Sequence, residues 1–253
     1  MSWLAQWHAR LVLAEFALAA VTLLALLRVR APYGRHARAG WGPTLSQRLA
    51  WVLMEAPAVL LWGAIFATGV YATEGVSVFF CALWMTHYVH RTFVYPLRIK
   101  PGAKRTPWLV VLLAIGFNTL NALVNAGQAS HVRHYEASWW LDARMVLGCL
   151  LFALGFAINQ HADWVLARLR GPGERGYKIP YGGLYRWVSC PNYLGEMCEW
   201  LGWATATWSL GGLAFAVYSA ANLVPRALDH HRWYREQFAD YPPERHAVIP
   251  WLL

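Results

Sequence analysis

Long apolar stretches dominate the sequence, and each is about long enough to cross a lipid bilayer as a helix. A spanning helix needs about 20 mostly apolar residues. The stretch 193–224 is too long for one span, and Trp208-Ser-Leu-Gly-Gly212 offers a turn because paired glycines weaken a helix. The sequence therefore predicts an all-α integral membrane protein with seven transmembrane helices. We expect them near residues 9–28, 49–71, 76–96, 107–127, 143–167, 193–208 and 211–233.

The charges between these stretches indicate how the helices are oriented. The first, third and fifth connections are basic, the second and fourth are acidic or mixed, and the sixth carries no charge. Basic loops stay on the cytoplasmic side of a membrane. We therefore expect the N-terminus outside and the C-terminus in the cytoplasm, as an odd number of spans requires. The basic loop residues are Arg28, Arg30, Arg35, Arg38, Arg48, Arg98, Lys100, Lys104, Arg105, Arg168, Arg170, Arg175, Lys178 and Arg186.

The composition supports a membrane protein and argues against several other classes. Hydrophobic residues make up 58% of the chain and charged residues only 14%. The net charge of +9 lies in the loops, so the sequence does not favour a nucleic-acid-binding protein. Four cysteines without a C-x-x-C spacing favour neither a disulfide scaffold nor a zinc site. A chain of 253 residues without repeats predicts one membrane domain, residues 1–253.

Ionisable side chains lie inside or beside the apolar stretches. Glu55 lies within the second stretch, Tyr88 and Arg91 within the third, and Glu196 and Glu199 within the sixth. A charge at bilayer depth costs at least a few kcal/mol, so such residues are candidates for a functional site. The sequence therefore predicts a polar cavity inside the helix bundle.

Three expected helices each carry a polar stripe near the cytoplasmic end. Residues four apart share one face of a helix. Interhelical hydrogen bonds could account for any one stripe, whereas three together with several arginines favour a nucleotide site. Arginine grips phosphate through two parallel hydrogen bonds. The stripes are Asn159 with Asp163, Asn192 with Glu196, and Arg226 with His230 and Tyr234.

Glu55 and Tyr88 lie deeper, on the second and third expected helices. A carboxyl buried in an apolar environment can stay protonated and donate a hydrogen bond. Beside a tyrosine hydroxyl it would form a pair of donors for a carbonyl oxygen, and such donors stabilise negative charge that develops there. The alternative is a Glu–Tyr hydrogen bond that only joins two helices.

Two short motifs point to chemistry that their context does not support. Gly171-Pro-Gly-Glu-Arg-Gly176 matches G-x-G-x-x-G, but a helical pattern precedes it, whereas a dinucleotide-binding turn follows a strand. His87-x-x-His90 and His230-His231 resemble the histidine boxes of membrane di-iron oxygenases. The remaining histidines are scattered singly, too few for two metal shells. We expect no metal.

Five separated motifs resemble the steroid 5α-reductase family, with the animal type-2 enzymes as the nearest pattern. The similarity extends over nearly the whole chain, with matching length and motif order. The motifs are His87-Tyr-Val-His-Arg-Thr-Phe-Val-Tyr95, Gly182-Gly-Leu-Tyr185, Pro191-Asn-Tyr-Leu-Gly-Glu196, His230-His-Arg-Trp-Tyr234 and Tyr241-Pro with Ile249-Pro.

The resemblance implies an enzyme that uses NADPH to reduce the C4–C5 double bond of a 3-oxo-Δ4 steroid. It implies that Glu55 and Tyr88 hold the 3-keto oxygen while hydride goes to C5. Helices 1–4 would carry this pair, and helices 5–7 with the cytoplasmic loops would form the NADPH site. The implied cofactor-binding residues are Asn159, Asp163, Arg170, Tyr177, Lys178, Asn192, Glu196, Arg226, His230, Tyr234 and Arg245.

The chain departs from the family pattern near these residues. Lys178 stands where the animal enzymes have arginine, which keeps the charge but loses the two-pronged hydrogen bonding. Pro191 and Asp229 also differ, which leaves the preference between NADPH and NADH open.

Two other functions remain as alternatives. A membrane methyltransferase of the isoprenylcysteine carboxyl type has a similar C-terminal half and would bind S-adenosylmethionine, although Glu55 and His87-Tyr88 favour the reductase. A lipid-binding or transport protein would bind no nucleotide.

The expected partners are a lipophilic enone that enters from the bilayer and membrane lipids, with the protein as a monomer. The alanine- and arginine-rich composition favours a bacterial source. We expect a multi-pass protein of the inner membrane in a bacterium, or of the endoplasmic reticulum in a eukaryote.

Overall fold

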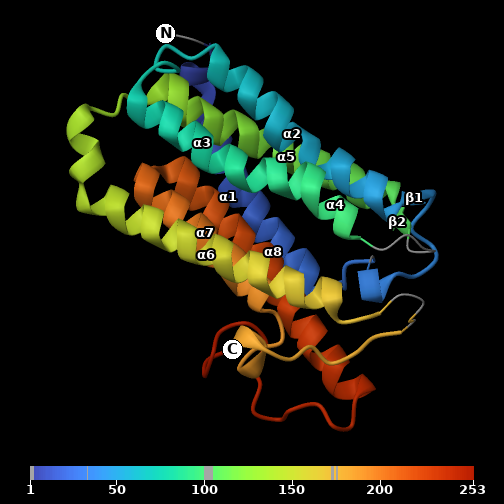
Figure 1. Cartoon of the computed structure of the whole chain (residues 1–253). Coiled ribbons are helices and arrows are strands. Elements are labelled where there is room, and N and C mark those ends of the chain that lie inside the picture. The colour runs from blue at the N-terminus through green and yellow to red at the C-terminus, as the bar shows by residue number, and fades with distance from the viewer. Residues whose placement is uncertain (1–2, 33, 100–104, 172–173, 175) are drawn as a thin grey trace.

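The computed structural model describes residues 3–32, 34–99, 105–171, 174 and 176–253. The charges predicted for the loops at Lys100, Lys104 and Arg175 lie outside the described residues, as does part of the 171–176 motif. The described chain is mostly helical, as predicted, and its long helices run roughly side by side (Figure 1).

Among the described residues, seven helical segments cover the stretches in which the seven spans are expected. Two of them contain a π-helical turn: α3 continues through η2 into α4, and α5 continues into η3. A π-helical turn inserts one extra residue and often occurs at functional sites. The segments are α1 (Trp3–Arg28), α2 (Gln47–Ala67), α3 (Gly75–Val89) with η2 (His90–Val94) and α4 (Tyr95–Arg98), α5 (Trp108–Gly127) with η3 (Gln128–Val132), α6 (Ala143–Arg168), α7 (Pro191–Thr207) and α8 (Leu210–Gln237).

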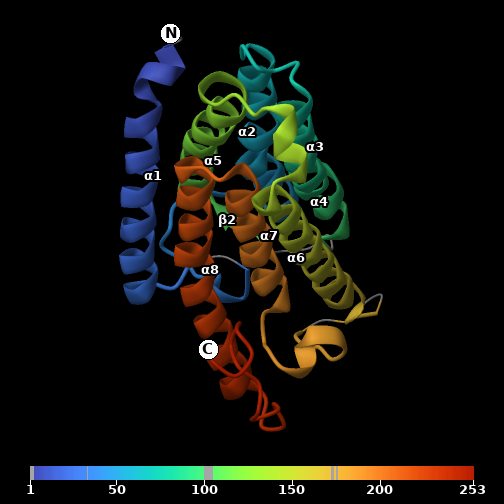
Figure 2. The same ribbon diagram turned by 90° about the vertical axis from the view of Figure 1, so that its left-hand side faces the viewer.

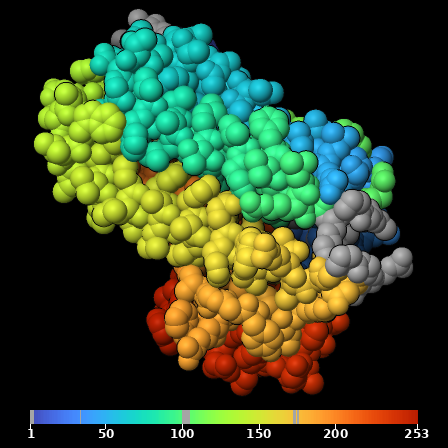
Figure 3. Space-filling model, in the orientation of Figure 1, coloured from blue at the N-terminus to red at the C-terminus, as the bar shows by residue number. Residues whose placement is uncertain are grey.

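Short elements connect these helices. Two three-residue strands, β1 (Thr44–Ser46) and β2 (Arg105–Pro107), pair antiparallel and join the segments that precede α2 and α5. The 3-10 helices are η1 (Gly34–His36), η4 (Ala137–Leu141) and η5 (Gly183–Arg186). The connection between α6 and α7 and the segment after α8 gather at one end of the bundle, in orange and red in Figure 3.

Four of the described helical segments are long and apolar enough to cross a membrane: Trp3–Arg28, Gln47–Ala67, Trp108–Val132 and Ala143–Arg168. They correspond to four of the seven predicted spans. The other three predicted spans fall on α3 with its continuation, on α7 and on α8, which are helical but carry the polar residues of the candidate site. The seven crossings and the orientation of the termini stay predictions.

The helices pack in pairs, of which α6 with α7 joins consecutive helices and the others join helices far apart in the sequence. α6 packs along α7, α2 along α5, and α1 along α8 and α5 (Figure 2). Buried aromatic rings fill the centre, where Trp84 contacts Trp62, Trp200 and Phe215. This central aromatic cluster borders the polar residues described below.

α6 and α7 approach closely because glycines face each other across their contact. A Cβ atom added to Gly195 would lie 2.5 Å from the Asn159 nitrogen and 2.6 Å from the Gly155 oxygen, and one on Gly202 would lie 2.7 Å from the Gly148 oxygen. Small residues at a membrane-helix interface allow such close contact. The polar residues on these two helices therefore come within hydrogen-bonding distance of one another.

The turn between the last two helices differs in detail from the prediction. α7 ends at Thr207, and Trp208 reverses the chain with a φ of 44°, while the Ser209 hydroxyl accepts a hydrogen bond from the Gly212 N–H. Gly211 and Gly212 lie in the first turn of α8 rather than in the connection. They are glycines because a Cβ would clash, at Gly211 with a Val124 methyl group only 2.8 Å away.

Candidate active site

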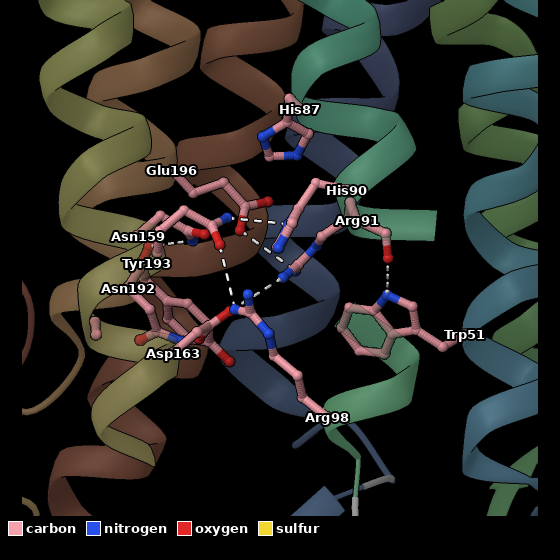
Figure 4. A network of polar contacts seen from close by, with 12 residues as sticks. Trp51, His87, His90, Arg91, Arg98, Asn159, Asp163, Asn192, Tyr193 and Glu196 are labelled. Atoms are coloured by element: carbon pink, nitrogen blue, oxygen red, sulfur yellow. Dashed lines mark hydrogen bonds and ion pairs between the residues drawn. The ribbon is translucent and has the colours of Figure 1, made fainter. Parts of the chain in front are cut away.

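A partly buried arginine forms the centre of the candidate site (Figure 4). Arg91 lies on the π-helical segment η2. Its guanidinium forms ion pairs with three carboxyls from three other helices: Glu196 at 3.4 Å, Asp163 at 3.8 Å and Glu55 at 3.9 Å. One positive charge thus faces three acidic groups, which joins α2, α3–η2, α6 and α7 at one point. No sequence spacing relates these four residues.

Aromatic rings hold the guanidinium in place. Its central carbon lies 4.6 Å from the centre of the Trp51 ring and 5.0 Å from that of Tyr95. The Trp51 indole N–H also donates to the Arg91 carbonyl at 3.1 Å. A cation over an aromatic face gains up to about 2 kcal/mol when it is shielded from water. These contacts add to the ion pairs in fixing the position of Arg91.

Glu55 and Tyr88 border this cluster from α2 and α3. The Asn118 amide donates to the Glu55 carboxyl at 3.4 Å and to the Met54 carbonyl at 2.7 Å. Tyr88 is only 4% exposed, lies within electrostatic range of Glu55, and stacks on Trp200 with ring centres 5.5 Å apart. Within the described residues no hydrogen bond joins Glu55 to Tyr88, and the roles of the two residues stay predictions.

His87 and Glu199 form a second buried contact nearby. The His87 Nδ1 and a Glu199 carboxyl oxygen lie 2.8 Å apart, and both residues are almost fully buried. His90 instead contacts the Gln160 side chain at 3.1 Å. Among the described residues no group of three His, Cys, Asp or Glu side chains could hold a metal ion.

The polar stripes of α6 and α7 face each other, as their spacing predicts. The Asn159 amide donates to the Asn192 carbonyl at 3.0 Å, and the Asn192 amide donates to the Asp163 carboxyl at 3.3 Å. Asn159 and Asp163 are buried. Asp163 also contacts Arg91. The α6–α7 stripe and the Arg91 cluster therefore form one continuous polar region.

The third stripe, on α8, joins this region through Tyr193 of α7. Arg226 donates to the Tyr193 hydroxyl at 3.0 Å, and that hydroxyl lies 3.2 Å from His230 Nε2. His230 Nδ1 in turn lies 3.1 Å from His36 Nε2. Burial lowers the pKa of His36, and the charge of Arg35 adds to this effect. Both causes favour a neutral His36 ring, which can share a hydrogen bond with His230.

Arg35 covers the end of the α8 stripe. Its guanidinium lies over the Tyr234 ring at 4.6 Å and over the Tyr177 ring at 5.5 Å, and it donates to the Tyr234 hydroxyl at 3.4 Å. Within the described residues, one buried nitrogen of Arg35, Nη1, has no hydrogen-bond partner. An unpartnered buried donor of this kind suits an anionic ligand.

The remaining predicted cofactor residues lie around the same end of the bundle. Arg170 donates to the Gly176 carbonyl at 3.1 Å, and Lys178 forms an exposed ion pair with Glu174 at 2.6 Å. Arg245 is 4% exposed, lies over the Tyr241 ring at 5.2 Å, and has Nε and Nη1 without a partner within the described residues.

Arg245 also borders a separate pocket. This pocket, of about 750 Å³, lies between the end of α6, η5 and the segment after α8. Neither Arg91 nor Glu55 lines it, so it is distinct from the polar region around those residues. The structure therefore brings together the three stripes with Glu55 and Tyr88, but it leaves Lys178 and Arg245 at the margin.

Several residues of this region had no predicted role. Arg91, Asn118, Trp51, Arg35 and Tyr193 make central contacts, but their partners lie on other helices. One signal was present for Arg91, because it follows Tyr88 by three residues in an apolar stretch and must find carboxyl partners there. Arg35 was counted only as a loop charge. Tyr193 lies beside Asn192 in a motif, yet its hydroxyl position depends on how α7 and α8 pack.

Comparisons with known proteins agree with the resemblance found in the motifs. The profile of the 3-oxo-5-alpha-steroid 4-dehydrogenase family matches residues 104–253. The chain is 43% identical to the steroid 5-alpha-reductase DET2 of Gossypium hirsutum over 95% of both chains. It is 40% identical to the 3-oxo-5-alpha-steroid 4-dehydrogenase 1 of Bos taurus over 94% of both, and 38% identical to that of Homo sapiens over 87% of this chain and 85% of the human one. These similarities do not favour the methyltransferase, and the nearness to the type-2 enzymes stays a prediction.

Proposed function

Because the chain belongs to the 3-oxo-5-alpha-steroid 4-dehydrogenase family, we propose that it reduces the C4–C5 double bond of 3-oxo-Δ4 steroids with NADPH. The product is the 5α-reduced 3-oxo steroid. The proposal rests on one polar region of the bundle that has two parts with different surroundings. Glu55 and Tyr88 lie beside a wall of aromatic rings, and the α6–α8 stripes lead away from them toward the arginines at the basic end of the bundle.

Glu55 and Tyr88 hold the 3-keto oxygen of the substrate by donating hydrogen bonds to it. An enone accepts hydride at its β carbon only when the negative charge that reaches the carbonyl oxygen is stabilised. Hydride adds to C5, the electron pair of the double bond moves toward the oxygen, and a proton then adds at C4. Tyr88 donates its phenolic proton in a hydrogen bond, and its stacking on Trp200 fixes the ring.

The donor role of Glu55 requires a protonated carboxyl, and the charges around Arg91 support this. One guanidinium faces Glu55, Asp163 and Glu196 within 4 Å. Arg98, whose charge also acts on Asp163, is a second cation near this cluster. At least one of the three carboxyls therefore lacks a counterion, and an uncompensated buried charge is costly. Protonating Glu55 removes one of the excess negative charges and makes its carboxyl a hydrogen-bond donor.

The polar stripes and the basic end of the bundle suit a dinucleotide. NADPH, when bound, supplies the hydride. Side-chain amides and carboxyls pair with its carboxamide and ribose hydroxyls, while arginines pair with its phosphates. The unpartnered nitrogens of Arg35 and Arg245 support an anionic ligand at this end. The residues that we assign to NADPH are Asn159, Asp163, Arg170, Tyr177, Lys178, Asn192, Glu196, Arg226, His230, Tyr234 and Arg245.

This chemistry also suggests how the protein lies in the membrane. We propose seven spans with the N-terminus outside, so that the basic end of the bundle faces the cytoplasm, where NADPH is soluble. The steroid, flat and apolar, enters from the bilayer, and one chain suffices for activity. Single cysteines placed at Thr73 and at Arg186 test the orientation. A membrane-impermeant maleimide added outside sealed vesicles should label Thr73→Cys and leave Arg186→Cys unlabelled; the reverse pattern would invert the topology.

The reaction itself is tested by anaerobic incubation of the purified protein with NADPH and testosterone. The expected result is loss of NADPH absorbance and a product with the added hydrogen on the α face of C5, identified by mass spectrometry and NMR. With deuterium at C4 of the nicotinamide, the label should appear at C5 of the steroid. No NADPH consumption with any 3-oxo-Δ4 steroid, or label at another carbon, refutes the proposal.

A further inference from the structure

α1 contains a buried carboxyl without a partner. Glu15 is 0% exposed, and within the described residues neither of its carboxyl oxygens has a hydrogen-bond partner. It lies in the middle of the row of buried residues by which α1 contacts the bundle, Leu4, His8, Val12, Glu15 and Ala19. An apolar residue at this position would pack without penalty, whereas a buried unpaired polar group costs about 1–3 kcal/mol or more. Packing alone therefore does not explain a glutamate here.

Neighbouring contacts place Glu15 relative to α5 and α8. His8 contacts the Val124 carbonyl at 3.0 Å, and Val12 clusters with Val124 and Ala214. α1 runs antiparallel to α5 and in the same direction as α8 (Figure 2). Glu15 lies one turn further along α1. Measured along the bundle, it is therefore at the same height as residues 117–121 on α5 and as the turn after Ala214 on α8.

An aromatic strip connects this level to the proposed catalytic pair. Tyr218 stacks on Phe117 with ring centres 3.5 Å apart and planes at 9°, and Phe117 lies 6.1 Å from Phe215. Phe215 contacts Trp200 at 4.3 Å, and Trp200 stacks on Tyr88. The rings touch one another in an unbroken row, with planes tilted by 9–44°, and such a row offers apolar contact to a rigid ligand.

α5 lies between the two glutamates. It packs against α2, which carries Glu55, and against α1, which carries Glu15. Asn118 contacts Glu55, and the adjacent Phe117 belongs to the aromatic strip. Asn121, one turn further along α5, is also fully buried, and its Nδ2 has no partner in the described part of the chain. A second unpartnered polar group thus occurs at the level of Glu15.

We propose that Glu15 binds an oxygen function, most favourably a hydroxyl, at the end of the steroid opposite the 3-ketone. This inference rests on the proposed function and adds a determinant of substrate choice to it. With the ketone at Glu55 and Tyr88, the ring system lies along the aromatic strip and its far end reaches the α1 contact. A hydroxyl both donates and accepts, so it pairs with a carboxyl in either direction. The protein then prefers steroids that carry a hydroxyl on the distal ring.

The test compares two substrates that differ only in that oxygen. Testosterone carries a 17-hydroxyl, and androst-4-en-3-one lacks it. We expect Glu15→Leu to lower kcat/KM for testosterone by roughly tenfold or more, the loss of one buried hydrogen bond, and to leave androst-4-en-3-one within about twofold of wild type. Glu15→Gln should fall between the two. Val12→Ala, which changes the same row of α1 without a polar group, is the control and should affect both substrates alike.

The outcomes separate this inference from the proposed function. Equal effects of Glu15→Leu on both steroids, or no effect on either, overturn the role of Glu15 while leaving the reductase assignment intact. A wild-type protein that reduces neither steroid refutes the reductase assignment and this inference together. Thermal unfolding without substrate gives a second readout. Glu15→Leu should melt at or above the wild-type temperature, and a marked loss of stability would show that Glu15 serves the fold instead.

Discussion

The close contact of α6 with α7 allows a sharp prediction, because the candidate site depends on one glycine there. In Gly195→Ala the new methyl group would lie 2.5 Å from the Asn159 nitrogen, 2.6 Å from the Gly155 oxygen and 3.0 Å from the Asn159 Cα. These are backbone atoms that cannot rotate away. Ordinary contact requires 3.4–4 Å, so the helices must separate by roughly 1 Å.

That separation has two consequences. Overpacking of this kind costs about 1–3 kcal/mol, which should lower the melting temperature in detergent by several degrees. The hydrogen bond from Asn159 to the Asn192 carbonyl, 3.0 Å long, would also stretch beyond its useful range. NADPH affinity should therefore fall, visible as a smaller rise of the melting temperature when NADPH is added.

A matched control makes the test specific. Gly116 lies on the exposed face of α5, and nothing lies within 4 Å of a Cβ added there. Gly116→Ala should be neutral or stabilising by up to about 1 kcal/mol, because alanine favours a helix over glycine. If Gly195→Ala has the same melting temperature and the same NADPH affinity as Gly116→Ala, the close contact of α6 with α7 does not control the site.

Two further predictions concern the polar end of the bundle. Arg35→Ala should raise the KM for NADPH about tenfold or more with a smaller change in kcat, because Arg35 contacts Tyr234 and has a buried nitrogen without a partner within the described residues. Steady-state kinetics measures both constants, with the exposed Arg38→Ala as the control. Equal KM values for the two variants would contradict the prediction. Burial raises the pKa of the Cys190 thiol to about 12, so alkylation of Cys190 in the folded protein should be slow at neutral pH and become fast on unfolding. Peptide mapping after timed alkylation measures both rates, and fast labelling of folded protein would refute the burial argument.

The sequence predicts the helices well because apolar length and the i, i+4 spacing are local properties. Asn159 and Asp163 on α6 were expected on one face, and they do meet Asn192 on α7. The turn after α7 was expected in the right place, and the last span, expected from residue 211, included the two glycines, but they were interpreted only as residues that weaken a helix. They belong to α8, where they allow contact with Val124, and such a contact between distant segments leaves no local signal.

The centre of the site was less predictable. Arg91 was visible as a charge in an apolar stretch, but its carboxyl partners lie on three other helices. The π-helical turn that presents it has no sequence signature comparable to a cap or a glycine pair. Glu15 shows the same limit, because in the sequence it is one acidic residue in an apolar helix, and only packing shows that it is buried and unpaired.

The central claim is that Glu55 and Tyr88 act on the ketone and not on the fold or the cofactor. Glu55→Gln and Tyr88→Phe keep nearly the same shape while altering or removing the donated proton. The direct measurement is single-turnover reduction of testosterone by each variant preloaded with NADPH, with NADPH binding checked by the shift of the melting temperature. Tyr88→Phe removes one donor to a developing oxyanion, which typically slows the chemical step about 10²–10³-fold, and Glu55→Gln replaces the acidic O–H by a weaker amide N–H donor. We predict losses of this order with an unchanged NADPH-induced shift, whereas reduction by both variants at the wild-type rate would contradict the account.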